Sequence, residues 1–222
     1  MIITIQRSLE DIKSSVEPYR KLAIIGCGGC AAVCQTGGTK QVDELARTLE
    51  GKEVMFTFQI DEPCDQRILA RELRRISDRM QGVDAVIALA CGTGVQALAS
   101  SVDKPCVTGL DTLFAGTVIH SSSYLENCNA CGECILNLTA AICPRTRCPK
   151  GIANGPCSEK VDETCCVDSE SECVWISIAR RAETLGLRVE APEFRPMDWA
   201  KHVGPRSIPV REVSIQKTEP EG

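Results

Sequence analysis

Lys21-Leu22-Ala23-Ile24-Ile25-Gly26 runs directly into Cys27-Gly28-Gly29-Cys30-Ala31-Ala32-Val33-Cys34, and this stretch decides the fold. The apolar run at its start is typical of a buried strand in a parallel sheet. The glycines and cysteines that follow stand at a strand-to-helix turn, where an α/β protein would otherwise place a phosphate loop. The stretch therefore predicts a parallel α/β sheet that carries metal-binding thiols at one of its turns.

On both sides of this stretch, short β-branched runs alternate with amphipathic segments up to about Asp111. Further strands are expected over residues 53–60, 83–90 and 106–110. Helices are expected over residues 8–19, 40–50, 67–81 and 95–102. Ser8 and Asp11 stand at capping-box spacing at the start of the first helix. The alternation predicts the α/β fold class, with a Rossmann/flavodoxin-like domain built on a parallel sheet.

The second half of the chain has a different character. Periodicity is lost around His120, and residues 127–173 are loop-like, with several prolines and glycines and few apolar residues. Such a segment is expected to be organised around metal, followed by a closing helix that begins near Trp175. The expected division is an α/β domain over 1–118, a small Cys-rich iron–sulfur or zinc domain over 119–190, and an extended or partner-bound tail over 191–222.

Composition narrows the possible functions. The chain has 15 cysteines in 222 residues, and no signal peptide is apparent at its start, so metal ligands are favoured over disulfides and a cytoplasmic location is expected. The net charge of −5 argues against a nucleic-acid partner, which would require a basic face. No apolar run approaches the roughly 20 residues of a membrane span.

The first thiol group, Cys27, Cys30 and Cys34, needs a fourth ligand. Cys64 and Cys91 each follow a predicted strand, so they should share the sheet edge of Cys27, whereas Cys106 begins a strand at the opposite edge. Cys91 is the preferred fourth ligand because it leads directly into Gly92-Thr93-Gly94. Cys64 is the alternative fourth ligand, and Cys106 is expected to be a buried structural thiol.

The second thiol group is denser. Cys128-x2-Cys131-x2-Cys134 has the spacing of a ferredoxin-type [4Fe–4S] loop. The candidate ligands of this group are Cys128, Cys131, Cys134, Cys143, Cys148, Cys157, Cys165 and Cys173. They could hold two clusters, or one cluster and a zinc ion, and their spacing does not separate these options or fix which cysteines share a site.

Residues suited to catalysis are scarce in the sequence. Gly26-Cys27-Gly28-Gly29 fits a dinucleotide-binding loop poorly because two more thiols follow it. There are only two histidines, His120 and His202, and no paired carboxylates near the cysteines, which leaves little for acid–base catalysis. A chain with abundant redox-metal ligands and without catalytic side chains is most simply an electron carrier.

The combined motifs resemble a known family over nearly the whole chain up to about Leu187. They are Ile25-Gly26-Cys27-Gly28-Gly29-Cys30, Leu89-Ala90-Cys91-Gly92, Asn127-Cys128-x2-Cys131-Gly132-x-Cys134, Cys143-Pro144-x3-Cys148-Pro149-Lys150-Gly151 and Asn154-Gly155-Pro156-Cys157. They are similar to the MetV family, the small iron–sulfur subunits of bacterial methylenetetrahydrofolate reductase, also called the methylenetetrahydrofolate reductase C-terminal domain family. In this resemblance Cys165 is the matched thiol and Cys166 is an additional one.

The resemblance implies an iron–sulfur subunit, with two or three [4Fe–4S] clusters or zinc in place of one. It also implies a flavin-containing MetF-type partner that reduces 5,10-methylenetetrahydrofolate to 5-methyltetrahydrofolate in the Wood–Ljungdahl pathway, with further electron-donating subunits as an option. Two alternatives stay open. One is a zinc-containing structural or activating subunit of the same complex, and the other is an iron–sulfur adaptor to a heterodisulfide-reductase-like or corrinoid-pathway enzyme.

Overall fold

The computed structural model describes residues 1–120, 123–159 and 162–189, so the expected tail over 191–222 lies outside the described residues. The chain divides into two compact units, Met1–Asn129 and Ala130–Gly222. The first unit continues past the expected boundary at residue 118 because a hairpin that follows the parallel sheet pairs with the first strand of the chain.

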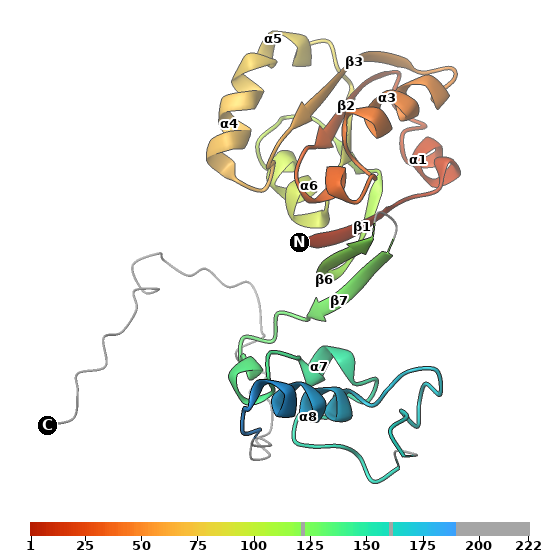
Figure 1. The fold of residues 1–222 in the computed structure, drawn as a ribbon. Helices are drawn as coiled ribbons and strands as arrows, with labels where there is room; N and C mark the ends of the chain where they lie inside the picture. Colours follow the sequence, from red (N-terminus) through yellow and green to blue (C-terminus); the bar gives the residue numbers. More distant parts are fainter. Residues whose placement is uncertain (121–122, 160–161, 190–222) are drawn as a thin grey trace, which may run out of the picture. The chain divides into compact units, whose positions relative to one another are not determined.

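A parallel four-stranded sheet forms the centre of the first unit (Figure 1). Its strands are β2 (Lys21–Cys27), β3 (Glu53–Ile60), β4 (Ala85–Leu89) and β5 (Cys106–Thr108), in the order β3-β2-β4-β5. The helices around it are α1 (Leu9–Ser15), α3 (Thr39–Thr48), α4 (Gln66–Arg75), α5 (Ser77–Met80) and α6 (Gly92–Ala99). The predicted parallel sheet and its alternation with helices are confirmed.

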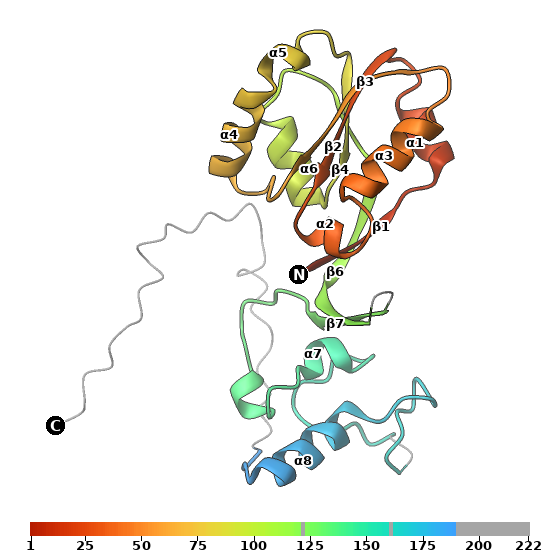
Figure 2. The same cartoon turned by 45° about the horizontal axis from the view of Figure 1, so that its top comes forward.

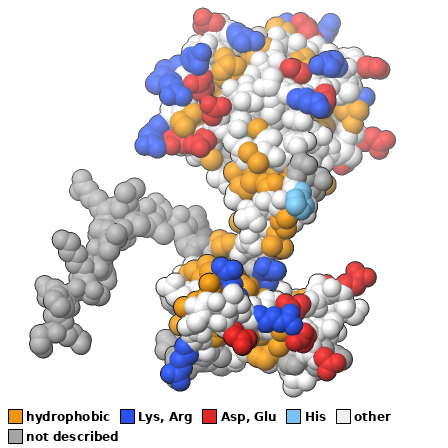
Figure 3. Space-filling view, viewed as in Figure 1, with side chains coloured by type: hydrophobic (Ala, Val, Ile, Leu, Met, Phe, Trp, Pro, Cys, Tyr) orange, Lys and Arg blue, Asp and Glu red, His pale blue; other side chains and the backbone are white. Residues whose placement is uncertain are grey.

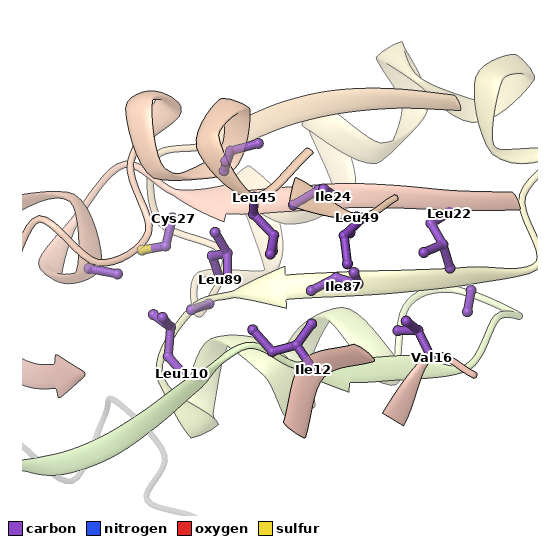
Figure 4. Close-up of a cluster of buried hydrophobic side chains, with 14 residues drawn as sticks. Ile12, Val16, Leu22, Ile24, Cys27, Leu45, Leu49, Ile87, Leu89 and Leu110 are labelled. Carbon is purple, nitrogen blue, oxygen red and sulfur yellow. The ribbon is translucent and has the colours of Figure 1, made fainter. Parts of the chain in front are cut away.

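The sheet is buried on both faces, since neighbouring residues of a strand point to opposite sides. Leu22 and Ile24 of β2 join one apolar cluster, and Ala23 and Ile25 join the other. Figure 4 shows the first cluster, in which Cys27 lies at one end of the row formed by Leu22 and Ile24. The central strands therefore provide a preformed apolar base for the thiol-bearing turn.

The predicted cap of the first helix is present. The Asp11 backbone N–H donates to Ser8 Oγ at 3.1 Å, and Ser8 Oγ–H donates to the Asp11 carboxylate at 2.6 Å. The helix ends at Ser15 and not near Tyr19, because Glu17 N–H bonds to Ser14 O and Tyr19 N–H to Val16 O in tighter turns.

An antiparallel three-stranded sheet completes the first unit, and the sequence pattern does not predict it. Its strands are β1 (Ile2–Gln6), β6 (Leu110–His120) and β7 (Ser123–Cys128), in the order β1-β6-β7. The short helix α2 (Cys30–Val33) packs against β1 (Figure 2). The buried hydroxyls of Thr4 and Thr36 lie 2.6 Å apart, which connects β1 to the turn after α2.

The second unit has little regular structure, as expected. It contains the 3₁₀ turn η1 (Leu136–Leu138), the short helix α7 (Pro144–Arg147) and the closing helix α8 (Val174–Leu185). Its apolar cluster consists of Cys173, Val174, Trp175 and Ile178, with partly buried neighbours that include Cys148. Two of the groups that fill this core are therefore thiols.

Charged side chains of both signs alternate on the surface around α4 (Figure 3). Glu72 is paired with Arg71 at 2.9 Å and with Arg75 at 2.8 Å, so these cations are neutralised locally. Within the described ranges, none of the helices has both the length and the apolarity that a bilayer crossing requires.

Candidate metal centres

Three cysteines lie at or just beyond the carboxyl ends of neighbouring parallel strands. Cys27 ends β2 and pairs in register with Ile60, the last residue of β3. Cys91 is the N-cap of α6 directly after β4, and Cys64 lies in the connection from β3 to α4. Cys106 begins β5 at the other edge of the sheet. The carboxyl edge thus collects the thiols that follow β2, β3 and β4.

The turn after β2 is packed tightly against the end of β3. Gly28 N–H donates to Ile60 O at 2.8 Å, and Cys27 Sγ lies 3.8 Å from Asp61 O. A Cβ atom on Gly29 would lie 2.9 Å from Asp61 O, so a larger residue at this position would displace the backbone. The glycines that the sequence places between Cys27 and Cys30 are therefore required by the close approach of two loops.

Burial raises the pKa of the Cys27 thiol, and the neighbouring Cys91 and Cys30 add to this effect. The backbone N–H groups of Gly29 and Ala31 oppose it, because they donate hydrogen bonds to the Cys27 sulfur. The pKa of Cys64 is also raised, first by desolvation and then by Cys91 and Cys30. Cys91 and Cys30 thus raise the pKa of both Cys27 and Cys64.

Cys34 has different surroundings. Its side chain is buried, its Sγ lies 3.7 Å from the carbonyl oxygen of Ile2 in β1, and its own carbonyl accepts the Tyr124 hydroxyl of β7 at 3.0 Å. Cys34 therefore connects the turn after β2 to both outer strands of the antiparallel sheet.

In the second unit, five thiols line one cavity of about 140 Å³. They are Cys148, Cys157, Cys165, Cys166 and Cys173. Four of them are sequence-predicted ligands, and Cys166 is the additional thiol. Cys131, Cys134 and Cys143 do not line this cavity.

Cys166 and Cys157 lie beside each other, with their sulfur atoms 3.8 Å apart. The Glu159 backbone N–H, which bonds to the Cys157 sulfur, is the largest cause of the lowered pKa of Cys157. Lys150 lowers the pKa of Cys166, but desolvation and Cys157 outweigh it, so the net shift is upward. Lys150 also pairs with Glu159, which places one cation beside two thiols.

Arg145 contacts the ferredoxin-like segment. Its guanidinium donates to Cys131 Sγ at 3.1 Å and to Glu133 O at 3.0 Å. Cys143 is the N-cap of α7, the helix that carries Arg145, and Cys134 is exposed. Cys128 is the last residue of β7, in the first unit. Nothing in the sequence pattern marks Arg145, since an isolated arginine carries no signal of its role.

The donor set consists of thiols, which suit iron–sulfur clusters and zinc. Over residues 1–120, 123–159 and 162–189, no three His, Cys, Asp or Glu side chains are arranged to hold a single metal ion. A cluster distributes its ligands over several metal atoms, so its thiolates stand farther apart than those of one ion. The thiol chemistry and the N–H and guanidinium donors to Cys27 and Cys131 fit a cluster.

No curated protein and no solved structure matches the chain. A family model does match, over residues 107–200, which include the nine cysteines from Cys128 to Cys173 and exclude the thiols of the first group. The description of this family is methylene-tetrahydrofolate reductase C terminal, and the match supports an association of this part of the chain with methylenetetrahydrofolate reductase.

Proposed function

We propose that the chain is the iron–sulfur electron-transfer subunit of a methylenetetrahydrofolate reductase complex, of the MetV type. The observation that carries the proposal is the match of residues 107–200 to the methylene-tetrahydrofolate reductase C-terminal family, in a segment that contains nine cysteines. The partner is a flavin-containing MetF-type subunit, which binds the folate and reduces 5,10-methylenetetrahydrofolate to 5-methyltetrahydrofolate.

The ligands proposed for the first site include Cys27, Cys30 and Cys91. Those proposed for the second group are Cys128, Cys131, Cys134, Cys143, Cys148, Cys157, Cys165 and Cys173. Bound [4Fe–4S] clusters, two or three in number, would supply one-electron transfer. The side chains and backbone of this chain bind and tune them.

Hydrogen bonds to ligand sulfur raise the reduction potential of a cluster because they stabilise the more negative, reduced state. The Gly29 and Ala31 N–H groups supply such bonds to Cys27, and Arg145 supplies one to Cys131 with a full positive charge. The Arg145 contact is therefore expected to raise the potential of a cluster bound at Cys131.

The test uses anaerobically purified chain together with a flavin-containing MetF-type protein. The chain alone should be reduced by a low-potential donor without converting methylenetetrahydrofolate. The mixture should transfer electrons from that donor to the folate. Folate reduction by the chain alone, without flavoprotein, would refute the carrier role, and failure to form a complex would favour the adaptor alternative.

A zinc-containing structural subunit of the same complex is the second candidate, favoured by the Cys157–Cys166 contact. Thiolates that share one tetrahedral zinc at a Zn–S distance of about 2.3 Å stand about 3.8 Å apart. The two sulfur atoms have this separation. Metal analysis with EPR distinguishes the candidates, because zinc without iron, sulfide or a reducible signal would leave only the structural role.

A further inference from the structure

Three loops at the carboxyl edge of the parallel sheet carry four cysteines of the first unit. We propose that the metal site there is built from Cys27, Cys30, Cys64 and Cys91, and that Cys34 is a structural residue. The inference deepens the proposed iron–sulfur function and rests on it. In this ligand set, Cys64 from a distant loop takes the place of Cys34, the last thiol of the Cys-x2-Cys-x3-Cys motif.

The loop that carries Cys64 is packed against the turn that carries Cys27 and Cys30. Asp61, three residues before Cys64, has its carbonyl oxygen 3.8 Å from Cys27 Sγ. The same oxygen would be 2.9 Å from a Cβ atom at Gly29. Asp65 N–H bonds back to Glu62 O at 2.9 Å, so the segment turns tightly between these positions and cannot carry Cys64 far away.

The same loop also contacts the start of α6. A Cβ atom at Gly94 would lie 3.2 Å from Pro63 Cγ and 3.0 Å from Ala90 Cβ. Pro63 directly precedes Cys64, and Ala90 directly precedes Cys91. The loop that carries Cys64 is thus fixed against the turn of Cys27 through Asp61 and against the start of α6 through Pro63.

The four thiols differ in how far solvent reaches them. Cys27 and Cys91 are buried, Cys30 is half-buried and Cys64 is exposed. A site built from these four thiols would be open to solvent on the side of Cys64.

Cys34 already has a structural role. Its Sγ lies beside Ile2 O, and its carbonyl holds Tyr124, so both ends of the residue contact the antiparallel sheet. Its burial is similar to that of Cys27, but the surroundings differ. The contacts of Cys34 lead to β1 and β7, whereas the contact of Cys27 leads to the Asp61 loop that carries Cys64.

Alkylation of the wild-type chain tests the ligand set without any substitution. The anaerobically purified, iron-containing protein is treated with iodoacetamide before and after the metal is removed by chelator and oxidant, and labelling is mapped by mass spectrometry. Cys64 should be labelled at least about tenfold faster after metal removal, because only a bound metal protects this exposed thiol. Cys106, half-buried at the other sheet edge, is the internal control and should keep its rate. Equal labelling of Cys64 in both states would overturn the proposal.

Serine variants give the second readout. Cys27→Ser, Cys30→Ser, Cys64→Ser and Cys91→Ser should each lose about four iron atoms per chain and the same EPR signal. Cys34→Ala and Cys106→Ser should retain both. Full iron content in Cys64→Ser, or loss of that cluster from a Cys34→Ala protein whose circular dichroism is unchanged, would overturn the ligand set. These outcomes are independent of electron delivery to a flavoprotein, on which the proposed function depends.

Discussion

The two units use cysteine in opposite ways. In the first unit the thiols stand at the edge of a sheet that is buried on both faces by apolar side chains such as Ile24, Ile25 and Ile87. In the second unit two of the thiols belong to the core, since Cys173 and Cys148 pack with Trp175 and Ile178. Under the proposed function, metal would be an addition to a finished fold in the first unit and a substitute for part of the core in the second.

Metal removal should show the difference between the two units most strongly. Chelation with oxidation is expected to abolish amide protection of α8 and to make residues 130–189 sensitive to protease, because so few apolar contacts remain there. The protection of β2 and β4 should stay within a factor of about two. Hydrogen exchange with mass spectrometry measures both in the same sample. A metal-free chain whose α8 stays protected would remove the distinction between the units.

Gly37→Ala tests the independent core of the first unit. A Cβ atom there would lie 2.2 Å from Leu89 O and 2.8 Å from Ala31 Cβ, which forces two backbone segments apart. The expected loss in the free energy of unfolding of this unit is about 2–3 kcal/mol, with or without metal. Urea denaturation followed by circular dichroism measures it.

Gly82→Ala is the matched control for that substitution. Its Cβ would meet only Met55 Cε at 3.6 Å, an ordinary contact, so the change should stay within about 0.5 kcal/mol. Equal effects at the two glycines would show that the packing around the thiol-bearing turn is looser than described.

Two substitutions that each remove one hydrogen bond compare how far the two units depend on metal. Trp175→Phe removes the bond from Nε1 to Ile152 O at 3.0 Å, and Tyr124→Phe removes the bond from its hydroxyl to Cys34 O at 3.0 Å. Each should destabilise its own unit by about 1 kcal/mol in the metal-loaded chain. After metal removal only the Tyr124→Phe effect should remain, as measured by local hydrogen exchange. A persistent Trp175→Phe effect would mean that the second unit folds without metal.

Cys166→Ser should have the smallest effect. Cys165 is the proposed ligand, so Cys165→Ser should lower the metal content, whereas Cys166→Ser should leave it unchanged within error. Elemental analysis of the two anaerobically purified variants decides the matter. A lower metal content in Cys166→Ser, with no change in Cys165→Ser, would show that Cys166 binds metal together with Cys157, whose sulfur atom lies 3.8 Å away.

Local patterns in the sequence predict the parallel sheet well. The strand Lys21–Cys27 and the Ser8 cap each depend on residues close together in the chain, and both are found where expected. The antiparallel sheet is missed because β1 is short and its partner lies far along the sequence. Gly116 and its neighbouring bulge further hide the alternation in β6.

For the thiol groups too, the sequence predicts local placement and misses contacts between distant segments. Strand order predicts that Cys64 and Cys91 reach the edge of Cys27, because that conclusion needs only topology. The position of Cys34 against Ile2 depends on β1, and the late cysteines share a cavity only after residues 163–173 fold back through the Thr164–Glu172 bridge. Arrangements that depend on tertiary closure of this kind leave no local periodicity in the sequence.

The pairing of β1 has a consequence for the order of folding. Ile2 pairs with Ala115 and Ile3 with Phe114, whereas β6 and β7 are joined by a short hairpin. Contacts between distant residues form slowly because a long loop must close first, and hairpins form early. During synthesis from the amino terminus, β1 has to wait until β6 has emerged. The parallel sheet and the β6–β7 hairpin can therefore assemble first, and β1 closes the first unit as one of its last steps.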